Sequence, residues 1–165
     1  LPAGAVVALS GDLGAGKTTF VKAVAAAAGI DPAEVVSPTF GLVHEHPLPQ
    51  SAARASAAGG CLVHADMYRL VAADELHELG WEDAVGRSLW TFVEWPERIA
   101  AALPHDRLDV EITVLPSEAR AFRFAARGPR HALVVAALRP LALPSRSTGV
   151  GSAVCDSGPP PPSST

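Results

Sequence analysis

The stretch that decides the fold of this chain reads Val6-Val-Ala-Leu-Ser-Gly-Asp-Leu-Gly-Ala-Gly-Lys-Thr-Thr19. An apolar run leads into a glycine-rich loop and then into the opening of a helix. Gly11, Gly16, Lys17 and Thr18 fill the pattern G-x-x-x-x-G-K-[ST] of a phosphate-binding P-loop. Such a loop needs glycines because its backbone N–H groups must curl around a phosphate without clashing Cβ atoms.

This loop predicts a site for a nucleoside triphosphate. The helix after it would turn its positive N-terminal end toward the phosphates. Lys17 would reach the β- and γ-phosphates, and the Thr18 hydroxyl would bind Mg²⁺. The chain has no Asn-Lys-x-Asp segment of the kind that selects guanine, so ATP is the expected nucleotide. The residues expected to bind it are Gly11, Asp12, Leu13, Gly14, Ala15, Gly16, Lys17, Thr18 and Thr19.

Strands alternating with helices predict an α/β fold of the P-loop NTPase type, a mainly parallel sheet flanked by helices. A period-two pattern over 108–114 and 121–125 adds a C-terminal antiparallel hairpin. Further strands are expected at 5–9, 40–44, 61–65 and 88–93, and helices at 18–28, 72–79, 81–85, 96–103 and 131–138. On the first helix, Phe20, Val24 and Ala28 are expected to pack on the sheet.

Composition bounds the rest of the chain. Residues 1–139 read as one domain, 47–60 as a surface loop, and 140–165 as a Pro/Ser-rich disordered tail. A net charge of −4 gives no argument for direct nucleic-acid binding. No apolar run is long enough to span a bilayer. Cys61 and Cys155 do not suggest a disulfide framework, so a cytoplasmic location is expected.

Two acids, Asp66 and Glu94, directly follow apolar strands. Ligands of open α/β sheets bind at the carboxyl ends of strands, so both carboxylates are candidates for the edge that holds the phosphates. Glu94 follows the longer apolar run and is the stronger candidate for a magnesium ligand of the Walker-B type. Asp66 would then orient or deprotonate the attacking water. The alternative for each acid is that it only caps the helix that follows it.

Two further residues fit the same edge. Thr39 lies in Ser-Pro-Thr-Phe after the first helix, where P-loop hydrolases place a switch segment, although an ordinary turn explains the pattern equally well. Trp95 could pack in the core, stack on a base or bind a partner. His44, His46 and His64 lack partner ligands at metal-site spacing and are interpreted as scattered surface or core histidines.

Five short segments occur together in a characteristic order. They are Gly-Asp-Leu-Gly-Ala-Gly-Lys-Thr-Thr at 11–19, Ser-Pro-Thr-Phe-x-Leu-Val at 37–43, His-x-Asp-x-Tyr-Arg-Leu at 64–70, Glu-Leu-x-x-Leu-Gly at 75–80 and Val-Glu-Trp-Pro-Glu at 93–97. In this order they resemble the TsaE family, bacterial P-loop ATPases of tRNA threonylcarbamoyladenosine (t6A) synthesis. The resemblance spans roughly residues 4 to 128.

The resemblance implies a small ATPase that joins a TsaB–TsaD pair and acts on tRNA only through that complex, in which TsaD is the transferase. It implies that Lys17 and Thr18 bind phosphate and magnesium, that Thr39 is a switch threonine, Asp66 an essential acid, Glu94 a magnesium ligand and Trp95 a required aromatic. The family normally has a strand and a helix before the P-loop strand, and these are expected to be missing here. The 47–60 loop is longer than typical, and the tail has no counterpart.

Three hypotheses for function follow. The leading one is a magnesium-dependent ATPase subunit of t6A synthesis, weakly active without its partners. The second is a P-loop small-molecule kinase in which Asp66 serves as the base for a substrate hydroxyl. The third is a non-hydrolytic assembly subunit whose bound ATP only orders an interface.

Overall fold

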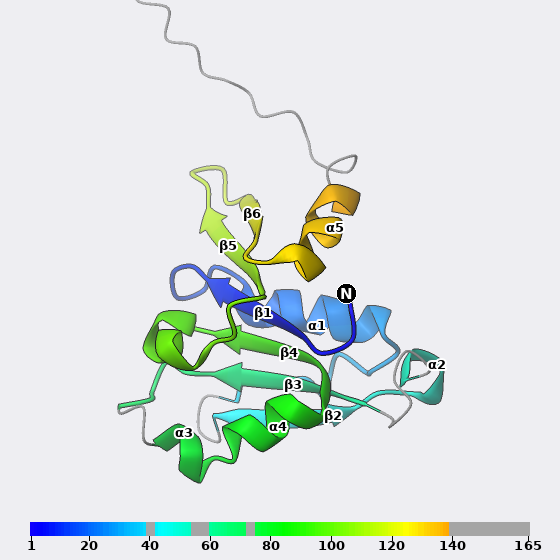
Figure 1. The fold of residues 1–165 in the computed structure, drawn as a ribbon. Helices are drawn as coiled ribbons and strands as arrows, with labels where there is room; N and C mark the ends of the chain where they lie inside the picture. Colours follow the sequence, from blue (N-terminus) through cyan, green and yellow to red (C-terminus); the bar gives the residue numbers. More distant parts are fainter. Residues whose placement is uncertain (39–41, 54–59, 72–74, 139–165) are drawn as a thin grey trace, which may run out of the picture.

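The computed structural model of this chain describes residues 1–38, 42–53, 60–71 and 75–138 (Figure 1). One sheet contains six strands in the order β2-β3-β4-β1-β5-β6. The strands are β1 (Ala5–Ser10), β2 (Val43–Pro47), β3 (Cys61–Asp66), β4 (Ser88–Glu94), β5 (Leu108–Val114) and β6 (Arg120–Ala126). The helices are α1 (Lys17–Ala27), α2 (Gln50–Ala53), α3 (Glu75–Glu78), α4 (Trp81–Arg87), the 3₁₀ helix η1 (Pro96–Ala102) and α5 (Pro129–Leu138).

The four central strands are parallel. β1 lies between β4 and β5 and runs parallel to both, and β3 runs parallel to β4. Antiparallel strands close the two edges, β2 beside β3 and β6 beside β5. The prediction of a mainly parallel α/β sheet with a C-terminal hairpin is therefore confirmed. All four parallel strands end at the same edge of the sheet, which brings the ends of β1, β3 and β4 together.

Helices cover both faces of the sheet, and two apolar clusters fill the space beneath them (Figure 1). Alternate residues of β1 divide between the clusters: Val7 and Leu9 face α1, and Val6 faces α3, α4 and η1. On α1 the fully buried apolar side chains are Val21 and Ala25. The expected contacts of Phe20, Val24 and Ala28 also exist, but these side chains border the cluster and remain partly exposed.

Several elements differ in extent from their predicted ranges. The stretch 47–60, predicted to be a loop, contains the short helix α2, and the helix expected at 96–103 is a 3₁₀ helix. β6 gains one residue at each end because its partner β5 pairs along its whole length, from Leu108 with Ala126 to Val114 with Arg120. The predicted tail at 140–165 and parts of the predicted elements at 40–44 and 72–79 lie outside the described residues. Among the helices that are described, none is long and apolar enough to cross a membrane.

Candidate functional site

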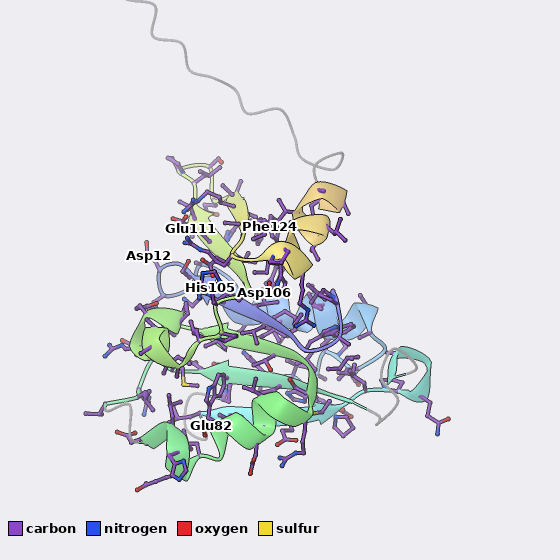
Figure 2. The ribbon with its side chains drawn as sticks, in the orientation of Figure 1. Asp12, Glu82, His105, Asp106, Glu111 and Phe124 are labelled. Atoms are coloured by element: carbon purple, nitrogen blue, oxygen red, sulfur yellow. The ribbon has the colours of Figure 1, made fainter. Side chains whose placement is uncertain are left out.

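A pocket of about 420 Å³ opens at the carboxyl edge of the sheet, where β1, β3 and β4 end. It is lined by Leu13, Gly14, Gly16, Lys17, Thr18, Thr19, Ser37, Asp66, Tyr68, Arg69, Glu94 and Trp95. Most of the residues predicted from the sequence to form the site therefore meet in one place. Three of the predicted loop residues do not line the pocket: Gly11, Asp12, which points into solvent (Figure 2), and Ala15, which is buried in the core.

The loop backbone takes conformations that require glycine. Gly11 has a φ of +141°, and a Cβ built on it would lie 2.3 Å from the carbonyl oxygen of Ile112 on β5. Gly16 has a φ of +109° and is the last residue before α1, so it turns the chain into the helix. The close approach at Gly11 sets where the loop leaves the sheet, and the turn at Gly16 aims the first N–H groups of α1 into the pocket.

Lys17 is the first residue of α1 and is only 4% exposed. Its Nζ donates hydrogen bonds to the carbonyl oxygens of Gly11 at 2.7 Å and Asp12 at 3.0 Å, and it lies 3.9 Å from the centre of the Trp95 ring. Burial lowers the pKa of Lys17, against the opposing pull of the carboxylates of Glu94 and Asp66. The ammonium group is thus held against the loop on one side and an aromatic face on the other.

Thr18 and Glu94 are joined directly, although 76 positions separate them in the sequence: Thr18 Oγ1 donates to Glu94 Oε1 at 2.7 Å. The contact forms because β4 pairs with β1 so that Glu94 lies opposite Leu9, the residue two before the loop. Glu94 does not cap η1, since no side chain caps that helix. A hydroxyl and a carboxylate oxygen in contact are the kind of donors that Mg²⁺ takes from proteins.

Asp66 lies beside Glu94, because the register of β3 and β4 pairs these two residues. Its side chain accepts hydrogen bonds from the Ser37 hydroxyl at 2.7 Å and from the backbone N–H of Tyr68 at 3.0 Å. The second bond is a local Asx turn and not a helix cap, because the described residues that follow Asp66 directly are not helical and α3 begins only at Glu75. Asp66 is only 5% exposed and still lines the pocket. Its carboxylate is held there by the Ser37 hydroxyl and by the turn at Tyr68.

Of the three roles considered for Trp95, the structure shows core packing, while base stacking and partner binding stay predictions. Trp95 packs against the apolar cluster beneath η1, and it lines the pocket, where its ring lies 4.9 Å from that of Tyr68. Its backbone is left-handed, with a φ of +59°, an uncommon conformation for a bulky residue that recurs at functional sites. Thr39 lies outside the described residues, and its neighbour Ser37 is the part of that segment placed at the pocket.

His64 belongs to the site and was not predicted to do so. Its Nε2 lies 2.8 Å from Glu94 Oε1, the same oxygen that Thr18 contacts, and its side chain is completely buried. The signal in the sequence was its position two residues before Asp66, which places both side chains on the same face of β3. His44 and His46, the other two histidines considered in the sequence, lie on β2, away from the pocket. The described part of the chain contains no group of three or more His, Cys, Asp and Glu that could hold a metal.

Comparison with known proteins gives a consistent assignment. The family model described as "Threonylcarbamoyl adenosine biosynthesis protein TsaE" matches residues 1–122. The tRNA threonylcarbamoyladenosine biosynthesis protein TsaE of Bacillus subtilis is 36% identical over 134 residues, which is 79% of this chain and 75% of that protein. The TsaE protein of Streptomyces coelicolor is 39% identical over 113 residues, covering 68% of this chain and 70% of its own length.

A solved structure agrees with the sequence comparison. The crystal structure of Bacillus subtilis YdiB superposes with a TM-score of 0.60 at 30% identity, covering 86% of this chain and 80% of the other. The P-loop, the paired acids at the strand ends and the extent of these matches lead to one conclusion. This chain belongs to the TsaE family of threonylcarbamoyl adenosine biosynthesis proteins.

Proposed function

We propose that this chain is a magnesium-dependent ATPase that supports t6A modification of tRNA together with a TsaB–TsaD pair. The observation that carries the proposal is the 2.7 Å hydrogen bond between Thr18 and Glu94, with Asp66 beside it. That bond joins a phosphate-binding loop to a strand-end acid. Phosphoryl-transfer sites need this combination, because their catalysis consists almost entirely of positioning and charge stabilisation.

In this proposal the loop and α1 bind the phosphates of ATP. The N–H groups that follow Gly14 and Gly16 and the positive end of α1 favour anions at this position. Lys17 would turn its ammonium group from the loop carbonyls to the β- and γ-phosphates. The burial that lowers its pKa also strengthens its attraction for a phosphate, since little water competes in the pocket.

Thr18 and Glu94 fit a magnesium ion by their chemistry, because both offer hard oxygen donors and lie within hydrogen-bond distance of each other. Bound there, Mg²⁺ would neutralise charge that develops on the phosphate oxygens. Asp66 would orient the attacking water, because its carboxylate lies next to Glu94 and is held by Ser37 and by the Tyr68 N–H.

Partner dependence has its own support at the mouth of the pocket. Leu13 on the loop is 79% exposed and Val71, just beyond the pocket residue Arg69, is 90% exposed. Tyr68, with its ring against Trp95, is 43% exposed. Large apolar side chains exposed around a pocket mark a surface that another protein covers. We therefore expect turnover to be weak without the TsaB–TsaD pair.

The experiment is a reconstituted modification reaction in which TsaB–TsaD must turn over many times on tRNA. At a Mg²⁺ concentration that just saturates the wild-type chain, that chain should support repeated t6A formation, Lys17→Ala should support none and Glu94→Gln should support much less. If Glu94→Gln bound the pair and still supported full modification, the chain would act only as an assembly subunit. If ATP phosphate appeared on a small-molecule acceptor rather than as free phosphate, the chain would be a kinase.

A further inference from the structure

A fully buried histidine contacts the pocket residue Glu94 from behind the pocket lining. His64 lies near the end of β3, opposite Phe92 of β4, with its side chain fully buried. Its neighbours on that face of β3 are Leu62, which is also fully buried, and Asp66 at the pocket. An apolar side chain would meet the packing needs of such a position, so the histidine requires another explanation.

The hydrogen bonding of the ring supplies that explanation. A carboxylate only accepts hydrogen bonds, so Nε2 is the donor in the contact with Glu94 Oε1. The other nitrogen, Nδ1, is buried, and among the described residues no group hydrogen-bonds to it. Leaving a buried polar atom unpaired costs stability. The histidine therefore leaves one buried nitrogen unpaired, which is unfavourable, while its other nitrogen donates a hydrogen bond to Glu94.

We infer that His64 is a positioning residue that holds the Glu94 carboxylate for magnesium, an inference that rests on the proposed function. Carboxylates that bind a metal are commonly held by hydrogen bonds from groups behind them. Here two donors reach the same oxygen, Thr18 from α1 at 2.7 Å and His64 from β3 at 2.8 Å. The donor from β3 is anchored in a central strand of the sheet, so it fixes Glu94 relative to the sheet.

His64 does not itself reach the nucleotide pocket. It is absent from the pocket lining and has no exposed surface, whereas Asp66, two residues along the same strand, lines the pocket. It therefore acts through Glu94 and not as a base. Removing its N–H should weaken metal binding and leave metal-free nucleotide binding on the loop unchanged, a pattern that general damage to the fold would not produce.

The test compares His64→Leu, which removes the donor, with His64→Gln, whose amide nitrogen lies near the original Nε2 position. Mn²⁺ serves as the metal probe, and electron paramagnetic resonance measures its affinity for the protein with bound ATP. His64→Leu should bind Mn²⁺ about 10- to 100-fold more weakly than wild type, and His64→Gln should recover most of the loss. ATP affinity measured in EDTA should be the same for all three proteins.

His46→Leu is the matched control, because His46 is also a buried strand histidine with an unpaired ring nitrogen but lies on β2, outside the pocket. It should bind Mn²⁺ like wild type. If His64→Leu does not fold, His64→Asn, whose amide is too short to reach Glu94, takes its place. Equal Mn²⁺ affinity in wild type and His64→Leu or His64→Asn, or no recovery in His64→Gln, would overturn the positioning role alone. A wild-type chain that fails to bind Mn²⁺ with ATP would overturn the proposed function as well.

Discussion

The close approach of Gly11 to β5 allows a quantitative prediction for the start of the P-loop. In Gly11→Ala the new Cβ would lie 2.3 Å from the carbonyl oxygen of Ile112 and 3.3 Å from the Cβ of Ala15. A carbon atom and a carbonyl oxygen are normally about 3.3 Å or more apart, so β1 and β5 would have to separate by about 1 Å. The two strands still pair just before this point, where Ser10 lies opposite Glu111, so the shift would strain the ladder.

Two terms contribute to the expected loss of stability. A side chain at the φ of +141° costs about 1–2 kcal/mol. The clash with a backbone atom adds about 1–3 kcal/mol, as overpacking does in other well-packed sites. Gly14→Ala is the matched control in the same loop: its φ is +77°, but nothing lies within 4 Å of a Cβ built there. Gly14→Ala should therefore lose only the stability that the unfavourable backbone conformation costs, about 1–2 kcal/mol.

Urea unfolding followed by circular dichroism measures both variants. Gly11→Ala should be less stable than Gly14→Ala by about 1–3 kcal/mol, because only the first substitution meets the β5 backbone. Equal loss in the two variants would refute the reasoning, since it would mean that the end of β1 does not lie against Ile112. Greater loss in Gly14→Ala would contradict the described loop geometry altogether.

Further predictions concern the charged and titrating groups. Lys17→Ala should abolish measurable ATP binding in a calorimetric titration. The ATP affinity of the wild-type chain should begin to fall at a lower pH than the pKa of an ordinary lysine predicts, because burial lowers the pKa of Lys17. Glu94→Gln should raise the Mg²⁺ concentration for half-maximal turnover by about tenfold or more, whereas Asp66→Asn should lower turnover at saturating Mg²⁺ by about 10²–10⁴-fold; the reverse pattern would exchange their roles. Burial, assisted by His64 and His44, lowers the pKa of His46, so the folded state binds that proton less tightly than the unfolded state. The free energy of unfolding should therefore fall as the pH falls below the ordinary histidine range, and His46→Gln should flatten this dependence in urea titrations; an unchanged dependence would contradict it.

Much of the fold could be predicted because its signals are local. The glycines and the lysine of the loop, the apolar runs of the parallel strands and the period-two pattern of β5 each depend on neighbouring residues, and β5 was predicted with its observed ends. The buried face of α1 was harder to predict from the sequence. Phe20, Val24 and Ala28 follow a helical period as well as Val21 and Ala25 do, and only the approach of the sheet decides which stripe is covered.

The site shows the same division between local and distant information. Asp66 and Glu94 could be selected because an acid at the end of an apolar strand stands out in the sequence. Their pairing depends on strand order, which places β4 between β1 and β3. His64 was missed because the histidines were compared with metal-site spacings and not with the alternation of β3. Its contact with Glu94 joins two strands, and the sequence of either one alone does not indicate it.

Phosphate release from ATP by the wild-type chain, measured with and without Mg²⁺ and with and without a TsaB–TsaD pair, is the direct test of the proposed ATPase. We expect release that requires Mg²⁺, rises when the pair is present and disappears in Lys17→Ala. Release that is indifferent to Mg²⁺, or that Lys17→Ala retains, would contradict the site described around Thr18 and Glu94. If the pair neither bound this chain nor stimulated phosphate release, the proposed role in t6A modification would be contradicted.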